Sequence, residues 1–202
     1  MSLLDILQYF GCLIGLKATD VGKTVGVLRG ENELWLGLVL MSGHLDELKP
    51  SSLAAVLQAI STEVKRPNLW TGFAASFESR EALNHLSSIM RELKSSQDRF
   101  NLNIPIYSEP ELMGLVEKWC SGITWKDLIS NTSLDEGDVV RIMRRTIDLL
   151  AQVPHCIAVS GQLKRNASEA LRALNRFPVR DAEDLLREQV KFELKLNPAT
   201  ER

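Results

Sequence analysis

Residues 134–150 read LDEGDVVRIMRRTIDLL, and their apolar side chains recur at the three- and four-residue spacing of an α-helix. One broad stripe is made by Val139, Val140, Ile142, Met143, Ile147, Leu149 and Leu150. The pattern predicts a long helix over residues 136–153 that buries this stripe. Ser133 and Glu136 have the S-x-x-E spacing of a capping box, which predicts the point at which the helix begins.

The opposite side of this helix carries Arg141, Arg144, Arg145 and Asp148. Guanidinium groups match phosphate oxygens well, so the three arginines are candidates for binding a phosphate backbone. The alternative is a solvated face on which Arg144 and Arg145 pair with Asp148, at helical spacings of four and three residues. Spacing alone favours the solvated face.

The remaining chain contains further segments with helical periodicity and capping residues. We predict helices over residues 3–13, 20–27, 33–42, 52–64, 79–101, 111–120, 125–130, 162–175 and 181–194. Alternation of the strand type is not found, which predicts an all-α fold, a helical bundle with a long central helix. The spacing of the segments 125–130 and 136–153 is similar to a helix-turn-helix.

Composition limits the classes of function. The formal net charge is -2, from 24 basic and 26 acidic side chains, so bulk charge gives no argument for nucleic acid. Cys12, Cys120 and Cys156 lack the paired spacing of a zinc ribbon and do not predict a disulfide scaffold. The longest apolar run, residues 34–41, is too short to cross a bilayer. These features predict a soluble, intracellular protein.

One short motif invites comparison with a nucleotide site. Gly22-Lys23-Thr24 matches the end of the phosphate loop G-x-x-x-x-G-K-[ST], but Lys17 stands where its first glycine is needed. We therefore expect a helix surface here, and no ATP hydrolysis by this chain alone.

Two other groups of residues could carry chemistry but are interpreted as structural. We expect the histidine–cysteine pair and the two other histidines to be loop and surface residues, and the tryptophans to be core residues rather than base-stacking platforms. These residues are His155, Cys156, His44, His85, Trp35, Trp70, Trp119 and Trp125.

Two stretches of the chain carry a family resemblance. Residues 115–125, LVEKWCSGITW, and residues 134–150 resemble the DSHCT domain, the C-terminal helical bundle of superkiller-type DExH-box RNA helicases. Residues 31–43, ENELWLGLVLMSG, resemble the start of the same bundle. The segment 136–152 is more similar to the cyanobacterial and chloroplast members than to the nuclear exosome-associated ones.

The resemblance implies an organisation and a set of RNA contacts. Residues 1–18 would be the tail of a preceding winged-helix-like region, 19–178 the bundle, and 179–202 a charged C-terminal helix or tail. The long helix corresponds to the ratchet helix, which contacts single-stranded RNA in the family. Arg145 falls at the RNA-touching position, Arg141 lies one turn earlier and Arg144 beside it, and Glu63 corresponds to a second contact.

The resemblance also implies partners and cofactors. The expected partners are single-stranded RNA, the RecA-like core domains of a helicase and other RNA-processing proteins, with no membrane. ATP and Mg²⁺ would belong to the parent helicase, and no cofactor is expected in this chain. The implied location is the cyanobacterial cytoplasm or the chloroplast stroma.

Three functions follow from these observations. The first is an RNA-contacting accessory domain of a helicase. The alternative is a protein–protein docking module without RNA affinity, in which the predicted helix 181–194 supplies a surface. Sequence-specific DNA binding by the helix-turn-helix-like segment is the third, and it is disfavoured because Asp135, Glu136 and Asp138 in the first helical turn would repel phosphates.

Overall fold

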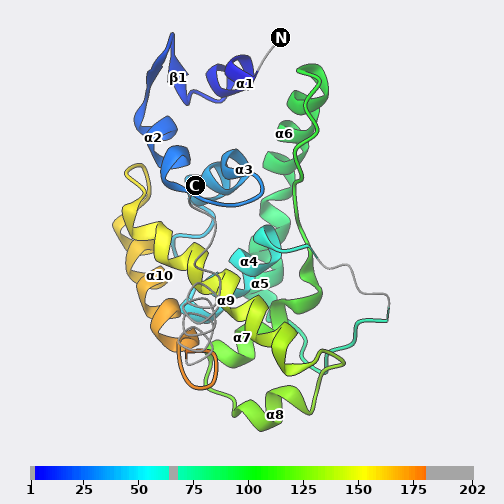
Figure 1. Ribbon diagram of the computed structural model, residues 1–202. Coiled ribbons are helices and arrows are strands. Elements are labelled where there is room, and N and C mark those ends of the chain that lie inside the picture. Colours follow the sequence, from blue (N-terminus) through cyan, green and yellow to red (C-terminus); the bar gives the residue numbers. More distant parts are fainter. Residues whose placement is uncertain (1–2, 64–67, 181–202) are drawn as a thin grey trace, which may run out of the picture.

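A computed structural model of the chain describes residues 3–63 and 68–180 (Figure 1). The fold is all-α, apart from one very short hairpin, and the predicted fold class is confirmed. The predicted helix 181–194 lies outside the described residues. No helix within the described ranges combines the length and apolarity needed to cross a bilayer.

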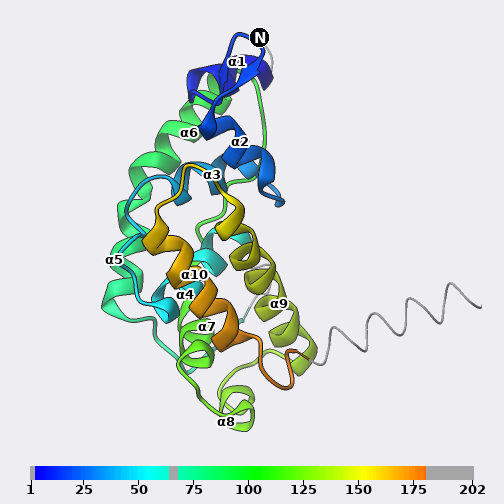
Figure 2. The same cartoon turned by 90° about the vertical axis from the view of Figure 1, so that its left-hand side faces the viewer.

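The central element of the bundle is α4 (Pro50–Ser61), in which every side chain from Ser52 to Ile60 is buried. Pro50 starts this helix two residues before the predicted point, because proline is favoured in the first helical turn. The helices α5 (Phe77–His85), α7 (Met113–Cys120), α9 (Glu136–Gln152) and α10 (Gly161–Leu174) pack around α4. Figure 2 shows α10 lying alongside α9, with α5 and α6 on the other side of the bundle.

A second layer covers one end of the bundle. It contains α1 (Leu3–Tyr9), α2 (Asp20–Val27), α3 (Glu33–Leu40) and the upper part of α6 (Ser87–Arg99), seen at the top of Figure 1. Thr19 caps α2 through the Gly22 amide, and Asn32 caps α3 through the Trp35 amide. Both helices therefore begin where the sequence predicts.

The hairpin between α1 and α2 was not expected from the sequence. Strands β1 (Leu13–Ile14) and β2 (Lys17–Ala18) pair antiparallel, with Leu13 opposite Ala18, around Gly15 at a φ of 61°. Strands of two residues are too short to show the alternation by which strands are predicted.

The single helix predicted over residues 79–101 is wrong in one respect, because the structure divides it at Leu86. The Leu86 amide bonds to the Leu83 carbonyl oxygen, three residues back, and the Leu86 side chain is 1% exposed. Burial of this side chain turns the chain from α5 into α6, and helical periodicity alone does not reveal such a turn.

At the other end of the bundle, the 3₁₀ turn Pro110–Leu112 leads into α7, and α8 (Trp125–Ile129) joins α7 to α9. A 3₁₀ turn, Val153–His155, follows α9. Trp35 and Trp119 are buried as predicted, but Trp70 is 54% exposed, so its assignment to the core is wrong. Its backbone explains this position, since the Trp70 N–H donates to the Ser133 hydroxyl at 2.8 Å and its carbonyl accepts from the Ser133 N–H at 2.9 Å.

The start of α9 at Glu136 is confirmed, but the predicted capping box is wrong. Asp135 caps the helix, with its carboxylate accepting from the Asp138 N–H at 2.8 Å. The Ser133 hydroxyl accepts from the Trp70 N–H, and Glu136 accepts from the Trp125 indole N–H at 3.2 Å, so neither residue takes its place in a capping box.

Candidate nucleic-acid interface

The outer face of α9 carries the predicted arginines, but they differ in exposure. Arg141 and Arg145 are exposed and Arg144 is half-buried. Arg141 pairs with Asp138 at 3.2 Å, whereas within residues 3–63 and 68–180 no side chain forms an ion pair with Arg145. In the predicted alternative both Arg144 and Arg145 pair with Asp148, and for Arg145 the described part of the chain shows no such pair.

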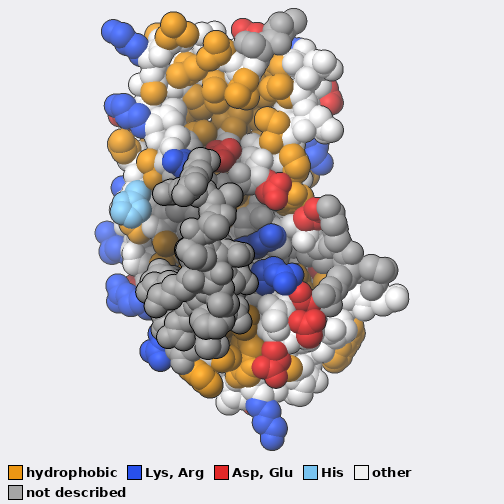
Figure 3. Space-filling model, viewed as in Figure 1, with side chains coloured by type: hydrophobic (Ala, Val, Ile, Leu, Met, Phe, Trp, Pro, Cys, Tyr) orange, Lys and Arg blue, Asp and Glu red, His pale blue; other side chains and the backbone are white. Residues whose placement is uncertain are grey.

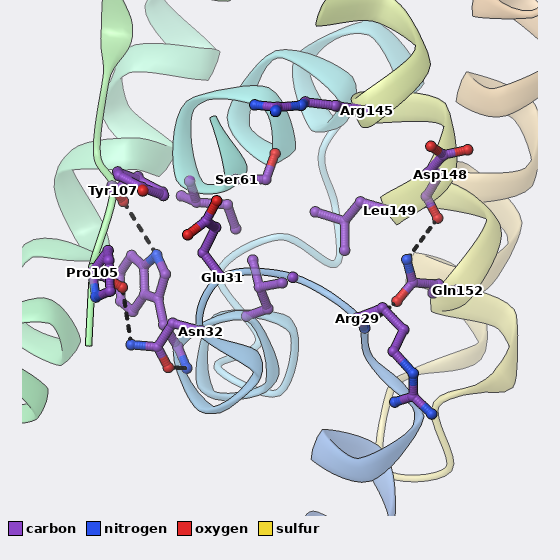
Figure 4. A pocket seen from close by; sticks show the side chains of 14 residues that line it. Arg29, Glu31, Asn32, Ser61, Pro105, Tyr107, Arg145, Asp148, Leu149 and Gln152 are labelled. Carbon is purple, nitrogen blue, oxygen red and sulfur yellow. Dashed lines mark hydrogen bonds between the residues drawn. The ribbon is translucent and has the colours of Figure 1, made fainter. Parts of the chain in front are cut away.

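Arg145 stands at the edge of a groove of about 610 Å³. On the face shown in Figure 3, basic and acidic side chains lie beside one another near the middle of the molecule. Four segments line the groove: α9, the loop between α2 and α3 with the start of α3, the end of α4, and the extended connection before α7 (Figure 4). The lining residues are Arg29, Gly30, Glu31, Asn32, Trp35, Leu36, Ile60, Ser61, Pro105, Tyr107, Arg145, Asp148, Leu149 and Gln152.

Asn32 and Trp35 hold one wall of the groove in place. The Asn32 amide group donates to the Pro105 carbonyl at 3.1 Å while its oxygen accepts from the Trp35 N–H at 3.0 Å. The Trp35 indole N–H donates to the Tyr107 carbonyl at 3.1 Å. Both side chains are buried, at 5% and 1% exposure, and their bonds to the connection are partly buried, so they fix the connection against α3.

Gln152 joins the opposite wall to the same loop. Its oxygen accepts from the Arg29 N–H at 2.6 Å, and its amide group donates to the Asp148 carbonyl at 2.9 Å. The Arg29 guanidinium donates to the carbonyls of Gly26 and Leu28, which are left unpaired at the end of α2. This arginine therefore serves mainly as a cap, and Arg145 is the cation offered to a ligand.

The groove combines charges of both signs with apolar surface. Figure 4 shows the Arg145 side chain extending across the mouth toward Ser61, with the Glu31 carboxylate beneath it and Asp148 on the α9 side. Among the described residues no cluster of three or more metal-ligating side chains occurs. The arrangement offers recognition of a ligand by hydrogen bonds, charge and apolar contact.

The structure does not bring all the predicted site residues together. Arg145 lines the groove, Arg141 lies one turn earlier on α9, and neither Arg144 nor Glu63 is among the lining residues. Glu63 is exposed just beyond α4 and lies close enough to Glu109 to affect the pKa of that carboxyl. Burial raises the pKa of Glu109, and the carboxylates of Glu111 and Glu63 raise it further.

Sequence reasoning missed most of the groove. Residues 30–32 and 102–110 lie between the predicted helices, where no part of a site is predicted. Asn32 carried a usable signal, because an asparagine directly before an apolar helix is a typical N-cap. The presence of Glu31 and Tyr107 in one groove had no local signal, since it depends on how the layers pack.

The segment Gly22-Lys23-Thr24 does not fit a nucleotide phosphate. The Gly22 N–H already donates to the Thr19 hydroxyl at 3.1 Å, and Lys23 pairs with Asp20 at 2.9 Å. Thr24 is buried, and its hydroxyl accepts from the Ala158 N–H at 2.9 Å. These three residues are structural parts of α2.

Comparison with known proteins identifies the family of the chain. Residues 15–182 match the model of the DSHCT (NUC185) domain. The chain is 34% identical over 163 residues to the DExH-box ATP-dependent RNA helicase DExH15 chloroplastic of Arabidopsis thaliana, covering 79% of this chain and 14% of that protein. Identity is 25% to the probable helicase HelY of Mycobacterium leprae (79% and 18% covered) and 22% to the exosome RNA helicase MTR4 of Mus musculus (77% and 15% covered). The chain thus spans less than a fifth of the length of these relatives, and it belongs to the DSHCT domain family of DExH-box RNA helicases.

Proposed function

We propose that this chain is an accessory domain of an ATP-dependent RNA helicase and contacts single-stranded RNA through the exposed face of α9. The observation that carries the proposal is Arg145, an exposed cation at the mouth of a groove that pairs with no acid among the described residues. Arg141, one turn earlier, extends the positive surface in the direction of the α9 N-terminus.

In this proposal the domain binds the RNA strand while the motor domains of a longer protein drive unwinding. The grip restrains backward slippage and so supports unwinding by RecA-like domains, which would bind ATP and Mg²⁺. The similarity to RNA helicases supports a helicase partner, and the chloroplastic relative supports a location in the chloroplast. Other RNA-processing proteins are further expected partners.

Arg144 and Glu63 take lesser parts in the proposed contact. Arg144 is half-buried, so it would approach the RNA backbone only from beside Arg145. Glu63 would have to accept hydrogen bonds from a 2′-hydroxyl or a base amino group, because a carboxylate repels phosphate.

The test is a titration of fluorescent single-stranded RNA with the chain at several salt concentrations. Two or three neutralised phosphates give a log–log salt slope of about -1.4 to -2. The variant Arg141→Glu/Arg145→Glu should lose binding. Arg165→Glu/Arg172→Glu, which makes the same charge change on exposed positions of α10, should retain most of it. A slope near zero, or equal losses in both variants, contradicts the proposal.

A second candidate function, protein docking, is favoured by an apolar cleft of about 310 Å³ between α1, α3 and α6. Its lining includes Leu3, Leu7, Leu34 and Ile104, and hydrophobic side chains gather over this end of the molecule in Figure 3. Tight binding to a recombinant helicase core that survives Arg141→Glu/Arg145→Glu, together with no RNA affinity, would favour docking as the only role.

A further inference from the structure

The charges in the groove decide which part of an RNA strand can enter it. Arg145 lies at the mouth, but Glu31 and Asp148 place two carboxylates on the walls. A phosphodiester chain running through the groove would meet these acids and be repelled. A neutral nucleobase would not, so the backbone is expected to stay at the mouth near Arg145 while a base turns inward.

The walls suit a base. Leu36, Ile60 and Leu149 give the groove an apolar lining, and Tyr107 adds an aromatic side chain. Recognition of unstacked single-stranded bases depends on such surfaces, together with hydrogen bonds to the Watson–Crick edge. A volume of about 610 Å³ leaves ample room for a purine.

Glu31 is placed to read the edge of that base. Figure 4 shows its carboxylate pointing into the groove, on the side where Ser61 and Tyr107 lie. The loop that carries Glu31 is held on both sides, by the bond from the Arg29 N–H to Gln152 and by the bond from Asn32 to Pro105. The side chain therefore starts from a fixed backbone position, which reduces the entropy lost when a ligand binds.

An ionised carboxylate only accepts hydrogen bonds, and its two oxygens can receive two adjacent donors. Guanine offers such a pair, the N1–H and the N2 amino group. Adenine and cytosine offer one amino group beside a ring acceptor, and uracil offers one N–H between two carbonyl oxygens that the carboxylate repels. The donor pattern therefore favours guanine.

We propose that this groove is a nucleobase site in which Glu31 selects guanine, with the adjoining backbone phosphate on Arg145. The inference rests on the proposed RNA contact and adds to it a base preference and the residue that determines it. Glu31 acts here as a specificity residue and has no part in gripping the backbone.

The experiment compares short oligouridines that carry a single guanosine, inosine, adenosine or cytidine, titrated with the whole chain. A bidentate base contact discriminates by about tenfold. Guanosine should therefore bind about tenfold tighter than uridine at one position, with inosine, which lacks the N2 amino group, in between. The uridine-only strand measures the base-independent contact through Arg141 and Arg145.

The variant Glu31→Gln separates base reading from general electrostatics. It should weaken binding of the guanosine strand while leaving the uridine strand unchanged or bound more tightly, because a negative charge has been removed. Glu47→Gln makes the same charge change at an exposed position outside the groove lining, and should keep the guanosine preference.

Three outcomes are informative. A guanosine preference that Glu31→Gln abolishes and Glu47→Gln retains supports the inference. RNA binding without base preference, or with a preference that Glu31→Gln leaves intact, overturns this inference and leaves the proposed RNA contact standing. Absence of binding to every strand overturns both.

Discussion

Glu117 is a carboxylate held inside the bundle, 9% exposed, where α7 meets α4 and α5. It accepts hydrogen bonds from the Ser76 N–H at 2.8 Å, the Ser79 hydroxyl at 3.1 Å and, at 3.2 Å, the Ser52 hydroxyl, whose single proton is shared with the Glu78 carboxylate at 2.7 Å. Hydrogen bonds to a charged group are stronger than neutral ones. One side chain thereby joins three helices, since Ser76 is the N-cap of α5.

We predict that Glu117→Gln lowers the free energy of unfolding by about 2 to 3 kcal/mol, because the amide cannot accept all three bonds and brings unwanted donors into the site. Chemical denaturation at neutral pH measures the loss. Glu169→Gln, at an exposed position of α10, is the matched control and should change stability little. Equal effects of the two substitutions would show that the buried bonds contribute nothing.

The same carboxylate predicts a pH dependence. Burial alone would raise the pKa of Glu117, but the hydrogen bonds from Ser76, Ser79 and Ser52 outweigh burial and hold the pKa below its ordinary value. The unfolded value is about 4.3. The stabilisation is therefore complete above that pH and is lost as the pH falls through the lower pKa of the folded state. In urea titrations from neutral to acidic pH, the difference between wild type and Glu117→Gln should shrink as the solution is acidified.

Two residues compete for the role of cap at the start of α9. In the structure the Asp135 carboxylate accepts from the Asp138 N–H, and the Ser133 hydroxyl accepts from the Trp70 N–H. We predict that Asp135→Ala destabilises the protein by about 1 kcal/mol and speeds hydrogen exchange of the Asp138 amide. Ser133→Ala should leave that amide protected and speed exchange at Trp70. Amide-resolved NMR exchange measures both, and the reverse pattern would restore the S-x-x-E capping box.

Elements whose signals are local could be predicted from the sequence. The helices α2 and α9 begin at the predicted residues, because periodicity and neighbouring polar caps are enough to place them. The division at Leu86 and the cap at Asp135 could not be predicted, since they depend on which side chain is buried and on a distant partner of Ser133. Both errors come from tertiary contacts that override a local pattern.

The candidate site also has one part that the sequence predicts and another that depends on tertiary contacts. Arg145 could be predicted as exposed because it lies opposite the apolar stripe of α9. Glu31, Ser61 and Tyr107 could not be linked to it, because they come from three other segments that meet only when the two layers pack together. Sequence patterns reveal a helix face, but a groove between four segments belongs to the assembled fold.

At the scale of the whole molecule, the two layers differ in how they are held. The bundle around α4 is secured by burial on every side and by cross-links such as the Asn166 amide, which donates to the carbonyls of Asp46 at 3.1 Å and Leu48 at 2.9 Å. In the end layer, Leu3 and Leu4 are 52% and 46% exposed, and Ile6 is the buried residue of α1. Fewer buried contacts mean a lower free energy of local opening.

We therefore predict an order of protection in native-state hydrogen exchange. Amides of α4 should exchange slowest, through global unfolding, whereas those of α1 and the hairpin should exchange through local opening that a low concentration of denaturant hardly affects. Glu117→Gln should accelerate amide exchange in α4 and leave exchange in α1 unchanged, because the hydrogen bonds of Glu117 lie within the bundle. Mass spectrometry of peptides from both layers measures this. If α1 and α4 exchanged at one common rate and responded equally to the substitution, the two layers would form a single cooperative unit, and the walls of the groove would separate only when the whole domain unfolds.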